Sequence, residues 1–375
     1  MLNSFIKSIF DGYREATKDK RKIGGNNMIE WLAIPLAMAG AAFIPKGKTK
    51  DKDKIQKIFE VGKLEVEYEH DGMLKLHVFE HSLPNKWTFD KRLLRPNKWE
   101  VPIGMNHKGI LYHDFEKYPH LLTGGVTRFG KTVFLKETFH TLLMNQPDNV
   151  EFYILDLKGG LEFYKYLSLP QVKSVACDVF EAAEVLNEIV EDLKKREAEF
   201  RGKGYTNIVD TPIQKRTFII VDEGAELAPD ILTGTARKYA QYCQSALSEI
   251  SRIGGGLGLR LLYCTQYPTK QAVPMQVKMN IVARLSFIAA AQVASMVILD
   301  EKGAEELPPI PGRAIYKMEK KRIVQVPYID DKMMFSMMEA KSDVILNSTA
   351  NRKPVDNDRS TGGCEDQAPS TNSRS

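Results

Sequence analysis

The stretch Gly125-Val-Thr-Arg-Phe-Gly130-Lys131-Thr132 matches the pattern GxxxxGK[ST], in which x stands for any residue. In this pattern the glycines let backbone N–H groups wrap a triphosphate, the lysine reaches the β- and γ-phosphates, and the hydroxyl ligates Mg²⁺. An apolar run precedes the stretch, and a segment with helical periodicity follows it and would point its N-terminus at the anion. We therefore predict an ATP site rather than a fortuitous loop. The residues expected to hold the nucleotide are Gly125, Val126, Thr127, Arg128, Phe129, Gly130, Lys131 and Thr132.

An acidic pair ends a second apolar run, which reads Phe218-Ile-Ile-Val-Asp222-Glu223. Four consecutive apolar residues are typical of a strand that is buried on both faces. We expect Asp222 to hold Mg²⁺, directly or through water, together with Thr132, and Glu223 to activate the attacking water. The alternative is a strand that ends in a solvated acidic turn, which is the role we expect for nearby Glu226.

A third run, Leu261-Leu-Tyr-Cys-Thr-Gln266, also ends in polar residues. Once a phosphate-binding loop is accepted, Gln266 is expected to sense the γ-phosphate. Because strands often end in polar residues, an ordinary strand end is the alternative.

Short apolar runs alternate with helix-length periodic segments from residue 120 onward, which indicates an α/β fold with a parallel sheet. One helix is well marked. Asp178 and Glu181 form a capping-box pattern at its start, and Gly202 and Gly204 are expected to end it. The apolar runs lie at residues 120–124, 151–156, 217–222, 259–265 and 281–287.

Composition and patterning divide the chain into five parts. Alternating segments at 63–68 and 74–79 are expected to pair as a hairpin around Asp71-Gly72. The C-terminal part lacks aromatic residues and is rich in small polar residues, so it is expected to be disordered. The expected parts are a basic N-terminal segment over 1–60, a small β-rich lead-in over 61–115, an ATPase domain over 116–330, a short helical segment over 331–346 and a disordered tail over 347–375.

The chain has 375 residues, of which 43% are hydrophobic and 27% charged, as in ordinary globular proteins. This composition excludes a wholly disordered, collagen-like or polytopic membrane protein. The net charge of +5 comes entirely from residues 1–60, which hold 12 basic and 7 acidic residues, because the remainder holds 41 of each. The body is therefore not globally basic, and any DNA contact there must be local.

An apolar run over 28–45 lies within the basic segment and is flanked by lysines and arginines on both sides. Its uncharged part has 15 residues, fewer than the roughly 20 that span a bilayer. Basic flanks suit anionic lipid headgroups. The run is therefore interpreted either as a membrane-inserted or membrane-resting helix or as a buried helix or protein contact.

Cysteines and histidines limit the chemistry further. All seven histidines lie between His70 and His140, which excludes a histidine-based triad or metal site from the later part of the chain. The cysteines form no CxxC pair, so reduced cytosolic thiols are favoured. They are Cys177, Cys243, Cys264 and Cys364.

Several motifs in one order resemble the FtsK/SpoIIIE family of DNA-pumping motor ATPases, over roughly residues 102–318. Residues 119–132, PHLLTGGVTRFGKT, are similar to the family's PHLLVAGATGSGKS, and residues 218–227, FIIVDEGAEL, to its VVIVDEFADL. The other similar motifs are 156–158 to DPK, 263–268 to ATQRP, 280–287 to NIPTRIAF and 298–306 to ILDQGGAE.

This resemblance implies a RecA-like P-loop NTPase domain that forms a ring around DNA, expected to be a hexamer, with ATP and Mg²⁺ between subunits. An arginine from the neighbouring subunit would complete each site. By position Arg284 is the first candidate and Arg252 the second, and the alternative for each is a surface or ion-paired arginine. The family's Gly-Ser before the last P-loop glycine is Arg128-Phe129 here, at positions where phosphate binding should survive. A further family arginine is replaced by Met296, which puts any role there in doubt.

A compact chain of this kind, without the family's DNA-orienting C-terminal module or its four membrane spans, resembles the coupling ATPases of Gram-positive conjugative elements. Those ATPases feed relaxase-bound DNA to a secretion channel. The resemblance implies DNA, a relaxase and secretion-channel proteins as partners. It also implies a location at the cytoplasmic face of the bacterial cell membrane, or in the cytoplasm if 28–45 does not insert.

Two other functions stay open. One is an FtsK-like ATPase that drives protein export, although such motors usually carry tandem ATPase domains and this chain has one P-loop. The other is a nucleotide-gated membrane adaptor. Glu223 argues against an adaptor, because a pure switch needs no catalytic acid.

Overall fold

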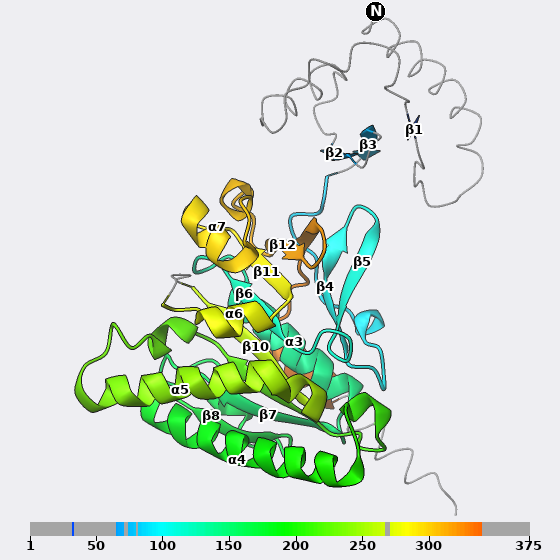
Figure 1. The fold of residues 1–375 in the computed structure, drawn as a ribbon. Coiled ribbons are helices and arrows are strands. Elements are labelled where there is room, and N and C mark those ends of the chain that lie inside the picture. Colours follow the sequence, from blue (N-terminus) through cyan, green and yellow to red (C-terminus); the bar gives the residue numbers. More distant parts are fainter. Residues whose placement is uncertain (1–31, 34–64, 71–73, 80–81, 267–270, 340–375) are drawn as a thin grey trace, which may run out of the picture. The chain divides into compact units, whose positions relative to one another are not determined.

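The computed structural model describes residues 32–33, 65–70, 74–79, 82–266 and 271–339 (Figure 1). The chain divides into two compact units, Met1–Asp330 and Asp331–Ser375, which are described separately. Most of the basic segment 1–60 with its run 28–45, and the whole tail 347–375, lie outside the described residues. Within the described ranges, no helix combines the length and apolar character that crossing a membrane requires.

A small antiparallel sheet precedes the main body, in the order β1-β3-β2. Its strands are β1 (Leu32–Ala33), β2 (Glu65–His70) and β3 (Leu74–Phe79). β3 has the bounds that the alternating pattern predicts, whereas β2 is shifted toward the turn and pairs Glu65 with Phe79 and His70 with Leu74.

The main body is built on a ten-stranded sheet in the order β5-β4-β13-β12-β11-β6-β10-β9-β7-β8. The six strands from β11 to β8 run parallel, and the other four pair antiparallel. The strands are β4 (Glu100–Asn106), β5 (Gly109–Asp114), β6 (Leu121–Gly124), β7 (Val150–Leu155), β8 (Val172–Ala176), β9 (Arg216–Val221), β10 (Leu259–Thr265), β11 (Ala283–Phe287), β12 (Arg313–Lys317) and β13 (Lys321–Gln325).

Each predicted apolar run overlaps one parallel strand, although β7 and β9 begin one residue earlier than predicted and β8 was not predicted. β6, β9, β10 and β11 are buried along their whole length. β10 lies between the P-loop strand β6 and the acid-bearing strand β9. Within the predicted lead-in, β2 and β3 belong to the small separate sheet, whereas β4 pairs with β13 and β5 pairs with β4, so that these two strands extend the main sheet. Since the parallel strands all end at one edge of the sheet, the polar residues that follow them converge there.

Helices cover both faces of this sheet. α4 begins as predicted, since Asp178 accepts hydrogen bonds from the backbone N–H groups of Phe180 and Glu181, and it ends at Gly204 with φ of 70°. The longer helices are α3 (Lys131–Asn145), α4 (Val179–Lys203), α5 (Gly234–Ile253), α6 (Met275–Asn280) and α7 (Gln292–Leu299). The 3-10 turns are η4 (Lys91–Leu93), η5 (Tyr164–Tyr166), η6 (Ile208–Asp210), η7 (Gly224–Leu227), η8 (Gly254–Leu257) and η9 (Ala304–Glu306).

Two cores hold these layers together. On one face, α4 and α5 lie side by side and bury aliphatic residues against β7, β9 and β10 (Figure 1). On the other face, where α3 lies, the rings of Phe139, Phe152 and Phe218 pack in a row, and Phe218 also contacts Phe115 and Trp99. The P-loop and the ends of the parallel strands are therefore held on rigid elements.

The C-terminal unit is described over a short stretch. Residues 331–339 are helical, and the remainder of the predicted helical segment 331–346 lies outside the described residues.

Candidate active site

The P-loop connects the end of β6 to the start of α3. Its backbone uses positive φ angles at Gly125 (145°), Arg128 (70°) and Gly130 (111°), which glycine adopts most readily. Gly130 is the N-cap of α3, and no side chain caps this helix end. The first N–H groups of α3 therefore provide an anion-binding end for phosphate oxygens.

The two P-loop glycines also meet close neighbours. A Cβ atom at Gly125 would lie 2.7 Å from the Cβ of Phe287, and one at Gly130 would lie 3.1 Å from the backbone N of Gly312. Val126 donates its N–H to the carbonyl of Ile288 (3.0 Å). The loop is thus fixed against the end of β11 and the turn before β12, while Thr127 and Arg128 are exposed.

Lys131 reaches from the P-loop to the end of β9. Its side chain is 3% exposed, and Nζ donates to the backbone carbonyl of Asp222 (2.5 Å) and to its Oδ1 (3.2 Å). Oε2 of Glu223 lies 3.9 Å from the same nitrogen. The structure therefore brings together the lysine and both acids that the sequence predicts to act as one site.

Asp222 is almost fully buried. Burial raises the pKa of its carboxyl, and nearby Lys131 opposes this effect. Asp156, at the end of neighbouring β7, also raises this pKa, and its buried Oδ1 has no hydrogen-bond partner among the described residues. Asp156, Asp222 and Glu223 thus place three carboxylates beside the two ammonium groups of Lys131 and Lys158.

This donor set fits Mg²⁺ bound together with a nucleotide. The hydroxyl of Thr132 and the carboxylate of Asp222 are the hard oxygen ligands that Mg²⁺ prefers. Within the described residues, no group of three or more His, Cys, Asp or Glu side chains could hold a metal by itself. Mg²⁺ usually keeps several waters and takes further oxygens from substrate phosphates, so two protein ligands are sufficient.

Glu223 is fully buried and held from several sides. Its Oε1 accepts hydrogen bonds from Thr265 Oγ1 (2.7 Å) and from the backbone N–H of Gln266 (2.9 Å), while Lys158 Nζ lies 3.1 Å from Oε2. The next residue, Gly224, packs directly under Tyr263, because a Cβ there would lie 2.2 Å from that ring. A carboxylate in such a fixed orientation can accept a proton from a positioned water.

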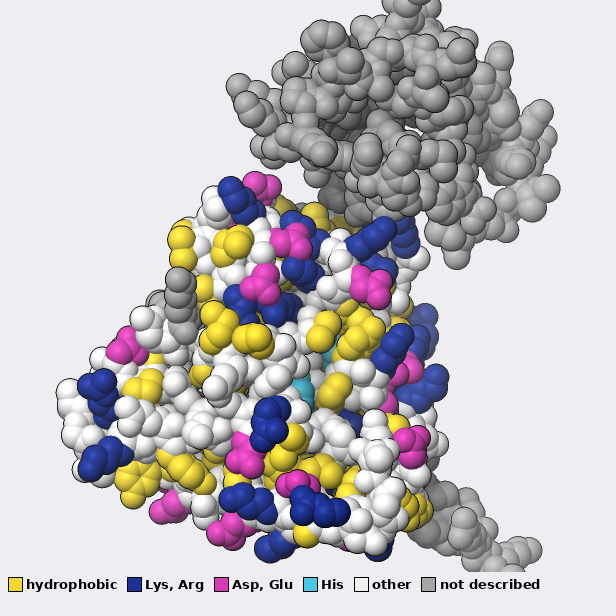
Figure 2. Space-filling model, in the orientation of Figure 1, with side chains coloured by type: hydrophobic (Ala, Val, Ile, Leu, Met, Phe, Trp, Pro, Cys, Tyr) yellow, Lys and Arg dark blue, Asp and Glu magenta, His cyan; other side chains and the backbone are white. Residues whose placement is uncertain are grey.

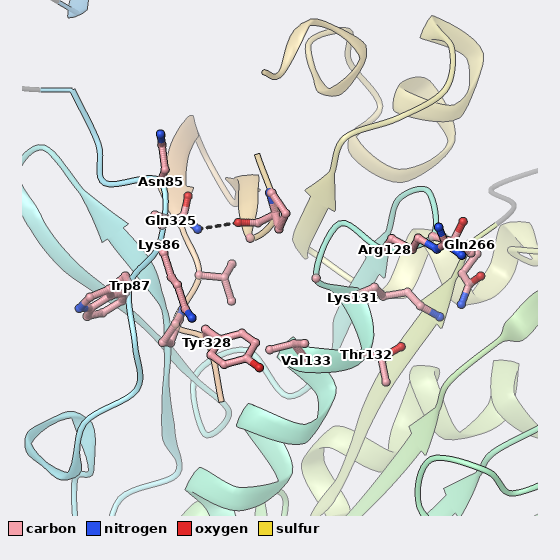
Figure 3. A pocket seen from close by; sticks show the side chains of 16 residues that line it. Asn85, Lys86, Trp87, Arg128, Lys131, Thr132, Val133, Gln266, Gln325 and Tyr328 are labelled. Atoms are coloured by element: carbon pink, nitrogen blue, oxygen red, sulfur yellow. Dashed lines mark hydrogen bonds between the residues drawn. The ribbon is translucent and has the colours of Figure 1, made fainter. Parts of the chain in front are cut away.

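Gln266 holds Glu223 through its backbone N–H and also lies at the P-loop pocket. Its N–H fixes Glu223, and the residue lines the same pocket as Lys131 and Thr132 (Figure 3). The predicted role of its side chain toward the γ-phosphate stays a prediction, as do the individual roles of the other site residues.

Sequence reasoning missed Lys158 as a site residue. It lies after β7, and β7 is the parallel neighbour of β9. The signal was present in the motif Asp156-Leu-Lys158, which follows a strand in the same way as Asp222-Glu223. The contact with Glu223 depends on strand order, which the motif alone does not give.

Arg284 is not free in this structure. Its side chain forms an ion pair with Asp300 and donates hydrogen bonds to the carbonyls of Ile281 (3.3 Å), Ile298 (3.2 Å) and Lys278 (3.1 Å). These contacts favour the ion-pair alternative for Arg284, whose action on a neighbouring subunit stays a prediction. Arg252, in the last turn of α5, is exposed.

Comparison with known proteins agrees with this geometry. Residues 89–222 match the sequence model of the FtsK/SpoIIIE family. Curated relatives include the DNA translocase FtsK of Tropheryma whipplei, 26% identical over 227 residues (57% of this chain and 30% of the relative). Another is the DNA translocase FtsK of Caldanaerobacter subterraneus, 29% identical over 228 residues (59% and 31%). The chain spans about a third of the length of these relatives.

Two solved structures share the fold. The conjugation coupling protein TcpA of pCW3, in its monomer form, aligns with a TM-score of 0.65 and 22% identity over 78% of this chain and 85% of TcpA. The cytoplasmic domain of the type VII secretion ATPase EccC of Thermomonospora curvata aligns with a TM-score of 0.56 and 23% identity over 69% and 33%. The predicted α/β fold with a large, mostly parallel sheet is thereby confirmed as similar to that of these ATPases, and residues 89–222 are similar to the FtsK/SpoIIIE family.

Proposed function

We propose that this protein hydrolyses ATP and uses the energy to move DNA. The observation that carries the proposal is the fixed carboxylate of Glu223, held by Thr265, Gln266 and Lys158 beside the P-loop lysine. A nucleotide-dependent switch does not need such an acid. The curated relatives named as DNA translocases support DNA as the substrate that is moved.

Each site residue then has a task. Lys131 leaves Asp222 to contact the β- and γ-phosphates, and Thr132 and Asp222 hold Mg²⁺, which would neutralise charge on the phosphates. Glu223 accepts a proton from the attacking water. Gln266 contacts the γ-phosphate through its side chain, while its backbone N–H, at the end of β10, donates to Glu223. Hydrolysis and the position of β10 are thereby coupled.

We also propose a ring of subunits, with a hexamer expected. α6, α7 and Val282, which lies between them, expose a set of large apolar side chains, and Figure 2 shows hydrophobic groups over both helices with charged side chains between the groups. Exposed patches of this kind often mark protein contacts. Its members are Met275 (62% exposed), Met279 (75%), Val282 (58%), Val293 (70%) and Met296 (41%). Met279→Glu should shift the protein toward monomers in light scattering.

The biological setting that we propose is DNA transfer in conjugation of a plasmid or integrative element, with a relaxase and secretion-channel proteins as partners. The fold likeness to a conjugation coupling protein supports this setting. The basic residues of 1–60 and the apolar run 28–45 support attachment to the cytoplasmic face of the cell membrane.

ATP turnover of the full chain tests the motor proposal. It is measured with double-stranded DNA, with single-stranded DNA and without DNA, beside Lys131→Ala as the inactive control. We expect DNA to stimulate the wild-type protein and to leave Lys131→Ala inactive. Equal turnover in all three conditions would contradict DNA as the substrate and favour the protein-export alternative.

Stimulation by DNA does not by itself show movement. ATP-dependent displacement of a third strand from triplex DNA measures translocation along the duplex. We expect displacement with the wild-type protein and none with Glu223→Gln, which keeps the shape of the side chain. DNA-stimulated hydrolysis without displacement would leave a DNA-responsive ATPase rather than a translocase.

A further inference from the structure

The cavity at the P-loop, about 380 Å³ in volume, continues beyond the residues that would hold phosphate. Lys131, Thr132 and Gln266 lie on one side, and Trp87 and Tyr328 lie on the other, with Val133 between the two groups (Figure 3). None of the described residues that line this cavity is acidic. The second side adds the aromatic residues Trp87 and Tyr328, and it also carries the polar side chains of Asn85, Lys86 and Gln325.

Two segments far apart in the chain form this second side, and we call them the clasp: residues 85–89 and 326–329. Tyr328 donates its N–H to the carbonyl of Trp87 (2.6 Å), and Phe89 donates its N–H to the carbonyl of Tyr328 (2.8 Å). Phe89 is 3% exposed and Ile329 is 1% exposed, whereas Tyr328 is 37% exposed. The clasp is thus anchored in the core while its tyrosine ring faces the cavity.

The clasp is also tied to the P-loop. Gly312 donates its N–H to the carbonyl of Phe129 (2.9 Å) and accepts a hydrogen bond from the N–H of Val326 (2.8 Å). Any larger residue at 312 would collide with Gln325, whose Nε2 would lie 2.5 Å from the new Cβ. The distance between the phosphate side and the aromatic side of the cavity is therefore fixed by backbone contacts.

A rigid aromatic surface beside a phosphate site suits a planar base. Bases stack on tyrosine rings, and every base offers a flat π-face to such a ring. Lys86 places its Nζ 4.5 Å from the centre of the Tyr328 ring, which restrains the orientation of the ring. We propose that the clasp binds the nucleobase of the nucleotide whose triphosphate lies in the P-loop, with Tyr328 as the stacking residue.

This inference rests on the proposed function only in that a nucleoside triphosphate occupies the P-loop. Binding is therefore measured on the full chain, by calorimetry without DNA, for ATP and for inorganic tripolyphosphate, which lacks a base. Tyr328→Ala should weaken ATP binding about tenfold, the loss of one stacked base, and leave tripolyphosphate binding unchanged. Tyr328→Phe should bind ATP like the wild type because it keeps the ring.

A second measurement, hydrogen exchange, distinguishes loss of base binding from a general loss of structure. A slowly hydrolysed ATP analogue should slow hydrogen exchange at the N–H groups of Phe89 and Tyr328 in the wild type, and tripolyphosphate should not. Tyr328→Leu serves if Tyr328→Ala does not fold. Equal weakening of ATP and tripolyphosphate, or unchanged ATP binding in the Ala and Leu variants, would overturn the proposal. Failure of hydrolysis or DNA stimulation in a protein that binds ATP would instead refute the motor and leave the clasp standing.

Discussion

Two clusters of buried charge lie at opposite ends of the same two strands, β9 and β10. At the carboxyl ends, Lys131 faces Asp222 and Glu223. At the amino ends, Glu116 accepts hydrogen bonds from Arg216 and Arg260, each 2.9 Å long. The two clusters are separated by the length of a six-residue strand, about 20 Å.

Most donors of the two arginines in the amino-end cluster are used within the fold, although Nε of Arg260 has no hydrogen-bond partner among the described residues. Arg216 also donates to the carbonyls of Ile213 and Lys215, and Arg260 to those of Gly255 and Leu259. Burial alone would raise the pKa of Glu116, but the two arginines outweigh it and hold this pKa below the usual value. At the carboxyl ends, by contrast, Lys131, which pairs with Asp222, lines an open cavity beside an uncapped helix end. Of these two clusters, the carboxyl-end one is therefore better placed to exchange its internal contacts for contacts with a ligand.

Of the substitutions that distinguish the two clusters, Glu223→Gln is expected to have the largest effect, which is a loss of ATP turnover. The amide keeps the volume of the side chain but cannot accept a proton, so ATP turnover should fall about 10³-fold while ATP still binds. Steady-state hydrolysis and nucleotide binding measure the two quantities. Glu226→Gln, an exposed neighbour, is the matched control and should change neither. Turnover within threefold of wild type in Glu223→Gln would remove this residue from the chemistry.

Glu116→Gln should produce the opposite pattern. It leaves two buried arginines without their acid, which should lower the free energy of unfolding by about 3 kcal/mol without changing turnover of the folded protein. Because the pKa of Glu116 is lowered on folding, its stabilisation is complete above the unfolded value and is lost as pH falls through the folded value.

Denaturant unfolding at pH 7 and at about pH 3 checks both statements about Glu116. The gap between wild type and Glu116→Gln should shrink at the lower pH, and the exposed control Glu184→Gln should show no gap at either pH. A gap that grows on acidification would show that the two arginines do not stabilise the charged form of Glu116.

Substitution of the buried residue Arg284 tests whether it stabilises the fold, as Arg216 and Arg260 are expected to do, or takes part in ATP turnover. Its removal leaves several carbonyls without their donor and leaves Asp300 with Lys278 as its remaining ion-pair partner among the described residues, so Arg284→Ala should lower the free energy of unfolding by about 1–3 kcal/mol, whereas exposed Arg252→Ala should not. Mixing dissociated Arg284→Ala and Lys131→Ala subunits tests the role between subunits. We expect no rescue of turnover, and rescue would establish Arg284 as the arginine that acts on the neighbour.

The smallest effect is expected for Lys158→Ala, which removes the ion pair to Glu223. Turnover should fall about tenfold, because the carboxylate loses one of the groups that orient it. Lys173→Ala is the matched control, since Lys173 is similarly exposed and also paired, but with Glu151 near the amino-end cluster. Equal effects of the two substitutions would show that Lys158 has no special relation to Glu223.

Local sequence predicts the parts of this site that lie within one turn or one strand end. The P-loop and the pair Asp222-Glu223 follow from spacing and from the apolar runs before them. Contacts that depend on strand order could not be read in this way, as with Lys158 and with the joining of β4 and β5 to the main sheet. The clasp could not be predicted for the same reason, because the hydrogen bond between Tyr328 and Trp87 joins two residues that are far apart in the sequence.

The contact between Gly224 and Tyr263 constrains how this chain can diverge from its relatives. The related motif VVIVDEFADL has a phenylalanine where this chain has Gly224, and here the ring of Tyr263 fills the space above that position. The aromatic ring beside Glu223 is thus supplied by β10 instead of by the loop. The two positions form a reciprocal pair: a phenylalanine at 224 fits this fold only if a small residue replaces Tyr263.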